Sequence, residues 1–164
     1  MTVGVYPGSF DPLTVAHLAV ADSARVHLGL DRLDLALSRA TLGKEHLDEA
    51  SLERRVVALE RASATRPWLA VVVVDAQLIA EIARGYDAVV MGADKWHQVN
   101  DPHWYGDDAA ARDAAVARLP RIVVAPRAEL EVPSALRLPL PDDYAEVSAT
   151  GVRAGRTEWA APVD

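Results

Sequence analysis

The sequence predicts an α/β protein in which a parallel five-stranded sheet carries helices on both of its faces. Short apolar runs alternate with longer segments whose apolar residues recur at a helical period, which is the order of parallel strands joined by right-handed crossovers. The run at residues 68–74 is continuously apolar and rich in valine, as expected of a strand that is covered on both faces. The length of 164 residues suits a single domain, residues 1–164, with a sizeable core.

The chain opens with an apolar strand at residues 2–6 and continues into a helix at residues 14–28. Apolar residues in the second segment recur near a helical period, and Gly29 supplies a stop signal. A tight turn that contains glycine and proline joins the two elements. The next strand is expected at residues 33–37, and it leads into a loop at residues 40–49.

The second helix is expected at residues 51–63. Ser51 can cap it, because a serine hydroxyl accepts a hydrogen bond from the free N–H groups of a helix start. Val56, Val57 and Leu59 form its expected buried face.

The rest of the chain repeats this alternation. A short helix at residues 76–84, a strand at residues 88–91, an alanine-rich helix at residues 107–118 and a strand at residues 121–125 follow the valine-rich strand. Residues 126–143 are rich in proline and are expected to be irregular. The arrangement is Rossmann-like, and ligands bind to such sheets beyond the carboxyl ends of the strands.

Composition excludes several classes of function. The chain has no cysteine, which excludes disulfides, thiolate zinc sites and a cysteine nucleophile. The formal net charge of −7 argues against a general affinity for nucleic acid, although a small anionic ligand remains compatible with it. No apolar run is long enough to span a bilayer and no secretory signal is present, so we expect a cytoplasmic protein with no membrane partner.

The most informative segment joins the first strand to the first helix, at residues 6–17. A helix start offers free N–H groups and the positive end of a dipole, which suits phosphate. Gly8 has no side chain and would let a ligand approach the backbone closely. Thr14 and His17 are three residues apart, so a hydroxyl and an imidazole share one helix face.

This segment resembles the signature of the nucleotidylyltransferase superfamily, Gly-(Ser/Thr)-Phe-Asp-Pro followed by (His/Thr)-x-Gly-His. Residues 8–12 match its first half, Thr14 and His17 match its second, and Ala16 stands where the family has glycine. The resemblance implies transfer of a nucleotidyl group onto the phosphate of a small molecule, with release of pyrophosphate. The preferred group is AMP, with ATP as its donor. It assigns His17 and Thr14 to catalysis and Gly8, Ser9, Phe10 and His17 to nucleotide binding.

A second segment, residues 147–153, resembles the family's C-terminal Ile-Ser-Ser-Thr-x-Ile-Arg. Ser148, Thr150 and Arg153 match it, and Ala149 replaces a serine. The resemblance implies that the three matching side chains hold the β- and γ-phosphates, for which the planar donor fork of an arginine is well suited. The alternative for this segment is a simple helix cap at Ser148.

The strand at residues 88–91 is followed by a Gly-x-Asp that resembles nicotinate mononucleotide adenylyltransferases. Gly92 would allow close approach of the nucleotide, and Asp94 could accept hydrogen bonds from ribose hydroxyls. Phosphopantetheine adenylyltransferases carry an arginine-bearing stretch at this place, which the chain lacks. The alternative is a turn in which Asp94 caps a helix.

Two further features point to an acceptor site. Trp96 and Trp104 lie in a polar segment that we expect to be a loop, and either could stack on a pyridine ring, local packing being the alternative. In the nicotinate branch a lysine after the second strand and an arginine of the next helix face the ligand phosphates, which points to Lys44 and to Arg54 or Arg55. Solvated charges are the alternative for these three residues.

The sequence therefore indicates an adenylyltransferase whose partners are ATP and a phosphorylated small molecule, with nicotinate or nicotinamide mononucleotide as the preferred acceptor. Mg²⁺ would bind through the nucleotide phosphates, and no dedicated protein metal site is expected, since the spacing of the loop histidines fits no tight ligand pair. The alternatives are a phosphopantetheine or other small-molecule nucleotidylyltransferase, and a non-catalytic nucleotide-binding protein suggested by Ala16, Ala149 and a short C-terminus. A homo-oligomer is left open, and no nucleic-acid partner is expected.

Overall fold

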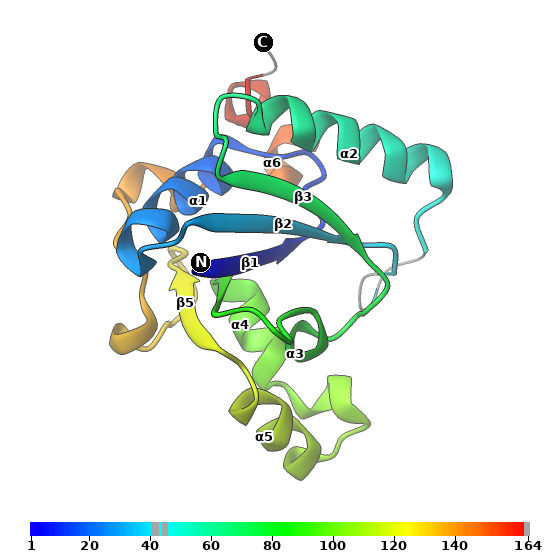
Figure 1. The fold of residues 1–164 in the computed structure, drawn as a ribbon, viewed down its shortest axis with the longest axis vertical. Helices are drawn as coiled ribbons and strands as arrows, with labels where there is room; N and C mark the ends of the chain where they lie inside the picture. The colour runs from blue at the N-terminus through cyan, green and yellow to red at the C-terminus, as the bar shows by residue number, and fades with distance from the viewer. Residues whose placement is uncertain (41–42, 44–45, 163–164) are drawn as a thin grey trace.

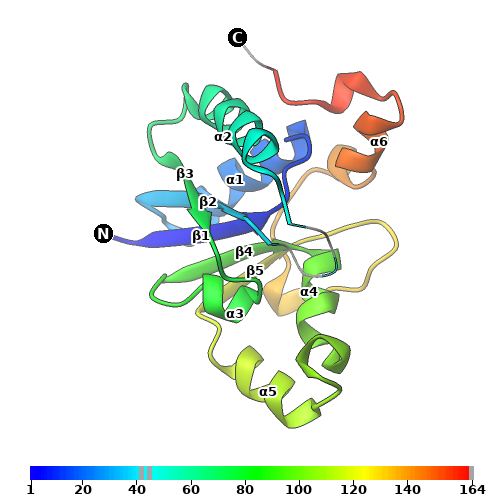
Figure 2. The ribbon, with the colours of Figure 1, turned by 90° about the vertical axis from the view of Figure 1, so that its right-hand side faces the viewer.

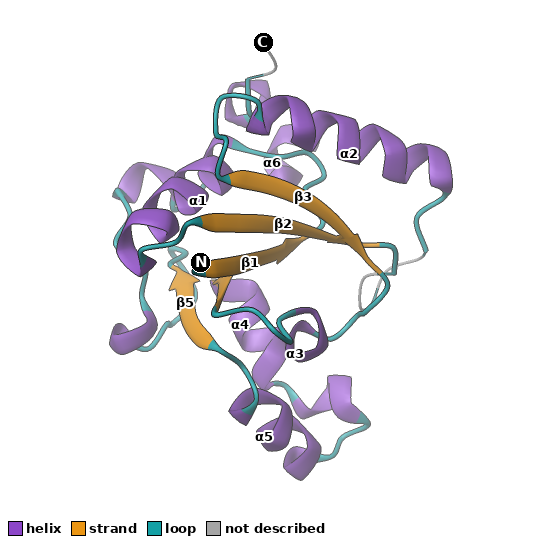
Figure 3. Ribbon diagram, viewed as in Figure 1, coloured by secondary structure: helices purple, strands orange, loops and turns teal. Residues whose placement is uncertain are grey.

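The computed structural model describes residues 1–40, 43 and 46–162. Within these residues a parallel sheet of five strands has the order β3-β2-β1-β4-β5, as Figures 1 and 3 show. All four strand pairings are parallel, which confirms the expected fold class. The strands are β1 (Val3–Gly8), β2 (Arg32–Ser38), β3 (Leu69–Val74), β4 (Ala88–Gly92) and β5 (Arg121–Ala125).

Helices cover both faces of the sheet, as the turned view of Figure 2 makes clear. One face carries α1 (Val15–Leu28) and α2 (Glu49–Ser63). The other carries the short α3 (Ile79–Ile82), α4 (Ala93–Asn100) and α5 (Ala109–Ala117). None of the helices formed by the described residues combines the length and hydropathy that a bilayer-crossing segment needs.

Two apolar clusters fill the spaces between the sheet and these layers. Alternation along β2 shows how the strands divide their side chains, because Leu35 and Leu37 face α1 and α2 while Ala36 faces the opposite layer. In β4, Val90 belongs to the first cluster, and Val89 and Met91 belong to the second. The central strands are therefore anchored on both sides, which holds their carboxyl ends at one fixed edge.

The first helix begins and ends where the sequence predicts. Thr14 is its N-cap, and Gly29 ends it in the left-handed conformation at a φ of 64°. The strand β5 also has its expected bounds, and the segment after it is irregular apart from the 3-10 turns η2 (Ser134–Leu136) and η3 (Asp142–Tyr144).

Several expected boundaries are wrong. The second helix begins at Glu49, because Asp48 is its N-cap and accepts a hydrogen bond from the N–H of Ser51 at 2.7 Å. Ser51 is thus the third residue inside the helix and not its cap. Val57 is 38% exposed, since it lies on the solvent side of the helix, whereas Leu59 is buried as expected.

The valine-rich run is a strand that contacts apolar residues on both faces, as expected, because Val71 and Val73 pack against one cluster and Val72 and Val74 against the other. It forms β3, which lies at an edge of the sheet and pairs with β2 on one side. Only Leu69 is fully buried, and the later residues of the strand are partly exposed. An apolar run marks contact with helices on both faces and does not by itself distinguish a central strand from an edge strand.

Two helices are shorter than expected, and one expected loop is ordered. The third helix has only one turn, and the fifth begins at Ala109 after an Asp108 cap. The aromatic segment expected to be a loop contains most of α4 and the 3-10 turn η1 (Pro102–Tyr105). Trp96 and Trp104 therefore lie on different elements.

The two faces of α2 give a direct test of this packing. Leu59→Ala should lower the free energy of unfolding by about 2–5 kcal/mol, because it opens a cavity in the core. Val57→Ala, two residues away, should change it by less than about 0.5 kcal/mol, because its side chain lies at the surface. Urea denaturation of both variants measures the difference, and equal losses would contradict the orientation of α2.

Candidate active site

A cavity of about 890 Å³ opens beyond the carboxyl ends of β1, β4 and β5. This is the position where ligands bind in open α/β sheets, because the chain runs from β1 outward to β2 and β3 and then returns to place β4 on the other side of β1, where the strand order reverses. Most of the residues predicted for the site line the cavity: Gly8, Ser9, Phe10, Thr14, His17, Gly92, Asp94, Trp104, Ser148, Thr150 and Arg153. Ala16, which replaces the family's glycine, also lies in its wall.

The turn after β1 folds a phenylalanine beneath the cavity floor. Phe10 is 4% exposed and has a φ of 45°. Its ring lies so close to Gly8 that a Cβ at that position would be 2.8 Å from Cζ, which explains the glycine. Its ring also meets those of Tyr6 and His17 edge-on, at centroid distances of 5.5 and 5.2 Å. Phe10 therefore supports the histidine from below.

Thr14 and His17 form a capping box at the start of α1. The N–H of Thr14 donates to Nδ1 of His17 at 2.9 Å, and the N–H of His17 donates to the Thr14 hydroxyl at 3.3 Å. Because a backbone N–H can only donate, Nδ1 must accept, and the neutral imidazole carries its proton on Nε2. The pair thus fixes both the ring orientation and the tautomer.

The protonation of His17 is set by its surroundings. Burial lowers its pKa from 6.5 to about 4, because desolvation disfavours the imidazolium. The charge of Asp94 opposes this shift, and the charge of Arg127 adds to it. At neutral pH the side chain is an uncharged hydrogen-bond donor.

The C-terminal motif forms the short helix α6 (Ala149–Arg153). Ser148 is its N-cap and accepts a hydrogen bond from the N–H of Gly151 at 3.0 Å, as the motif's capping alternative expects. Arg153 donates to the hydroxyl of Thr150 at 3.0 Å and to the backbone carbonyl of Asp11. This arginine joins the two motifs from opposite ends of the chain.

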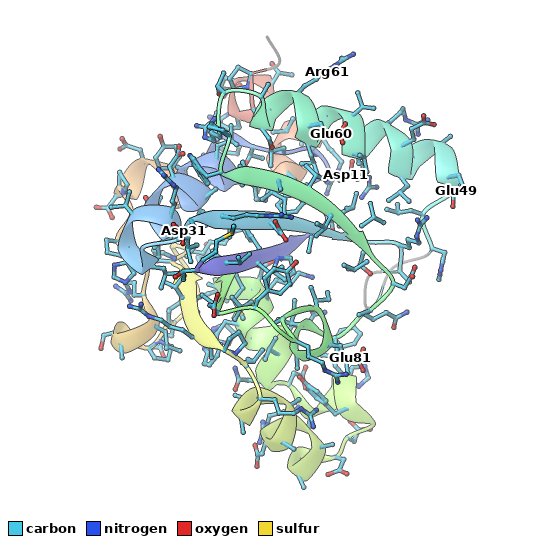
Figure 4. All side chains as sticks on the ribbon, in the orientation of Figure 1. Asp11, Asp31, Glu49, Glu60, Arg61 and Glu81 are labelled. Carbon is cyan, nitrogen blue, oxygen red and sulfur yellow. The ribbon has the colours of Figure 1, made fainter. Side chains whose placement is uncertain are left out.

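Asp11 is the meeting point of three elements and lies beside α2, as Figure 4 shows. Arg55 of α2 donates to its carboxylate and to the carbonyl of Ser9, both at 3.2 Å. Arg153 approaches the same carboxylate at 3.9 Å. Arg55 therefore holds the loop after β1 and does not line the cavity, and Arg54 donates to Ser51. Neither arginine is among the described residues that line the cavity.

The helix α4 brings further groups to the cavity. Gly92 is its N-cap, and a Cβ there would lie 2.8 Å from a carboxylate oxygen of Asp94, so glycine leaves room for that carboxylate. Asp94 itself lies in the first turn and is not the cap. Nζ of Lys95 donates to Oε1 of Gln98 at 3.2 Å.

The two tryptophans separate in the structure. Trp104 lines the cavity from η1, and its ring lies against Gly43, where a Cβ would be 2.8 Å from it. Trp96 is partly buried, packs against the cluster beneath α4 and does not line the cavity. Lys44, also expected near the acceptor, lies outside the described residues.

Several lining residues have no counterpart in the sequence prediction: Tyr6, Lys95, Gln98, Arg127 and Arg137. Tyr6 and Arg127 carry a usable signal, since Tyr6 lies in the carboxyl half of β1 and Arg127 comes two residues after the end of β5. Burial, with a smaller effect from the charge of Asp94, raises the pKa of Tyr6, so its hydroxyl stays protonated. Across residues 1–40, 43 and 46–162, no group of three or more histidine, aspartate or glutamate side chains is placed to hold a metal ion.

Comparison with known proteins identifies the sequence relationship. Residues 5–155 match the cytidylyltransferase-like family. The chain is 35% identical over 138 residues to a probable nicotinate-nucleotide adenylyltransferase of Bordetella pertussis, a match that covers 78% of this chain and 70% of the relative. It is 28% identical over 125 residues to one of Treponema pallidum, which covers 66% and 60%. A third, from Enterococcus faecalis, is 32% identical over 126 residues, which covers 60% and 54%.

The surroundings of His17 predict how it titrates. In the free protein its imidazole should titrate near pH 4, and two-dimensional NMR of the ring nitrogens should show the Nε2–H tautomer at neutral pH. Since the folded pKa lies below the unfolded value of 6.5, the unfolded chain binds this proton first. The contribution of His17 to stability is therefore present above pH 6.5 and declines between 6.5 and about 4. A titration midpoint near 6.5 would contradict the buried, neutral histidine.

Proposed function

The chain belongs to the cytidylyltransferase-like family, and from this premise we propose that it transfers AMP from ATP to the phosphate of nicotinate mononucleotide. The observation that carries the proposal is the cavity itself, where a neutral histidine donor and the arginine of a second motif meet at the switch point of the sheet. The names of the curated relatives and the Gly-x-Asp after β4 favour the nicotinate acceptor.

The reaction needs positioning more than proton transfer. An oxygen of the acceptor phosphate attacks the α-phosphorus of ATP, the bond from that phosphorus to the bridging oxygen breaks, and pyrophosphate leaves with the bonding electrons. The attacking phosphate is already ionised at neutral pH, so no general base is required. A preorganised donor that follows the growing charge on the α-phosphate lowers the barrier directly.

His17 fits the role of this donor. Its Nδ1 is occupied by the N–H of Thr14, so Nε2–H is the group available to the α-phosphate. The low pKa keeps the ring neutral, so it can donate a hydrogen bond to the substrate without transferring a proton to it. Thr14 acts through His17, since its own side chain is only 1% exposed.

Arg153 fits the β- and γ-phosphates. Its guanidinium has five N–H donors. One of them donates to the carbonyl of Asp11 and another to the hydroxyl of Thr150. About half of the side chain is exposed, so it remains open to a polyphosphate. Ser148 and Thr150 present hydroxyls on the same short helix.

Mg²⁺ fits the site as an ion that arrives with ATP. In phosphate-binding sites Mg²⁺ keeps several of its waters and is held by the substrate phosphates together with one or two carboxylates, so the cavity needs no dedicated cluster of ligands. Asp94 and Asp142 are carboxylates in the cavity wall that would hold the ion through its waters. When bound, the ion neutralises charge on the departing pyrophosphate.

The acceptor ring is assigned to Trp104. Its indole lines the cavity, and its contact with Gly43 holds it in place, whereas Trp96 packs away from the cavity. Stacking on a flat pyridine would favour a nicotinate acceptor over phosphopantetheine, which has no ring.

An assay of pyrophosphate release tests the proposal. With ATP, the wild-type protein should turn over nicotinate mononucleotide in preference to nicotinamide mononucleotide and phosphopantetheine. His17→Ala should lower turnover by about 10²-fold or more, as for loss of a preorganised donor. It should also lower stability by about 1 kcal/mol, because it removes half of the capping box.

The matched control is His27→Ala, which removes an exposed histidine from the same helix and should leave turnover unchanged. Normal turnover by the folded fraction of His17→Ala would refute the catalytic assignment. Release with phosphopantetheine alone would refute the nicotinate acceptor, and ATP binding without turnover of any acceptor would favour a non-catalytic nucleotide-binding protein.

The tryptophan pair tests the acceptor site. Trp104→Ala should weaken nicotinate mononucleotide several-fold, since stacking is worth about 0.5–1.5 kcal/mol beyond buried area. Trp96→Phe should not, because that ring lies outside the cavity. Fluorescence quenching and KM values measure both effects, with KM for ATP unchanged in each variant. Equal effects of the two substitutions would place the acceptor elsewhere.

A further inference from the structure

The described residues that follow α6 turn back toward the start of α1, and we name residues 155–162 the C-terminal strap. Gly155 makes the reversal with a φ of 115°. The N–H of Arg156 then donates to the carbonyl of Gly151 at 2.9 Å. The 3-10 turn η4 (Thr157–Trp159) carries the chain across α6, and Figure 2 shows the last residues leaving it in the direction of α1 and α2.

One end of the C-terminal strap is fixed on α6 by Trp159. A Cβ built on Gly151 would lie 2.4 Å from Cζ3 of the indole, so the ring rests directly on the helix backbone. The guanidinium of Arg156 covers the ring at 4.1 Å from its centroid. The glycine at this position is therefore explained by the tryptophan, whose ring contacts the helix that carries Arg153.

The other end lies on the cap of α1. Ala160 forms an antiparallel bridge with Thr14, and the N–H of Ala161 donates to the carbonyl of Leu13 at 3.0 Å. Ala161 also packs against the apolar cluster under α1. The C-terminal strap thus contacts the residue whose N–H and hydroxyl hold the imidazole of His17.

We propose that the C-terminal strap is a positioning device, in which Trp159 fixes α6 relative to the Thr14–His17 pair. Trp159 is not among the described residues that line the cavity, so it acts through Gly151 and Thr14 and not on the substrate. The catalytic meaning of the inference rests on the function proposed above, whereas the structural coupling does not. A near-attack geometry requires a fixed separation between His17, the donor to the α-phosphate, and Arg153, the cation for the outer phosphates.

His17 reports on this coupling independently of activity. Asp94 of α4 and Arg127 after β5 act on its charge, and the rings of Tyr6 and Phe10 pack against it. The described contacts of the C-terminal strap do not include Asp94 or Arg127, whereas Ala161 packs against the apolar cluster that contains Tyr6 and Phe10. A loosened strap should therefore leave the two charges in place, admit water beside Thr14 and these rings, and raise the pKa of His17 toward 6.5.

The test compares three variants by NMR titration of His17. In Trp159→Ala the pKa should rise by at least about one unit, because the strap loses its anchor on α6 and its contact with the cap of α1 loosens. Gly151→Ala, which pushes the indole away without removing it, should act in the same direction. The control is Trp68→Ala. The guanidinium of Arg25 lies 5.1 Å from the centroid of the Trp68 ring, which makes a similar pair, and Trp68 is not among the described residues that line the cavity.

Steady-state kinetics provide the second readout. Trp159→Ala should lower kcat about ten-fold and raise KM for ATP, while Trp159→Phe restores both, since misplacement of a catalytic group by an ångström costs up to about 10²-fold. If Trp159→Ala does not fold, Ala161→Pro replaces it, because that change removes the N–H that bonds to Leu13 and leaves Trp159 in place. An unchanged His17 titration with unchanged KM for ATP overturns the proposal. A wild-type protein without activity refutes the proposed function. In that case the titration of His17 still tests whether the C-terminal strap positions the Thr14–His17 pair.

Discussion

The reciprocal hydrogen bonding of Thr14 and His17 is the constraint on which the rest of the site depends. The free N–H groups at the start of α1 must find acceptors, and the side chain that satisfies one of them is the imidazole itself. That arrangement fixes the tautomer, aims Nε2 at the cavity and makes the position of the ring a property of the helix. Phe10 supports the pair from below, and the antiparallel bridge from Ala160 covers it from the other side.

Charged side chains of both signs line the cavity of this acidic protein. Lys95, Arg127, Arg137 and Arg153 lie in its wall beside the carboxylates of Asp11, Asp94, Glu129, Glu131 and Asp142. An anionic ligand is therefore expected to bind through contacts with particular arginines and not through a uniformly positive field. Asp11 approaches Arg55 of α2 and Arg153 of α6, so the guanidinium of Arg153 is positioned before any ligand arrives.

Local signals predicted α1 well, because Thr14 and Gly29 are a cap and a stop whose effect depends on their own neighbours. The start of α2 was misplaced because Asp48 and Ser51 are both good caps, and only the backbone shows which of them is used. Most of the residues predicted for the site line the cavity, although its wall also contains many residues that no motif indicated. The contact of Trp159 with Gly151 and the bridge from Ala160 to Thr14 could not be predicted, because they depend on long-range packing that leaves no periodic trace. The same holds for the separation of Trp96 from Trp104, which results from the path of the chain between α4 and η1.

The double use of His17 has a consequence for how its two roles can be told apart. Because the imidazole also completes a helix start, losing it costs about 1 kcal/mol of stability unless the new side chain can accept from the N–H of Thr14. Glutamine can do so, and a protein with glutamine at this position would keep the helix start without the imidazole. The architecture of the helix start and the chemistry proposed for the histidine can therefore be separated by one substitution.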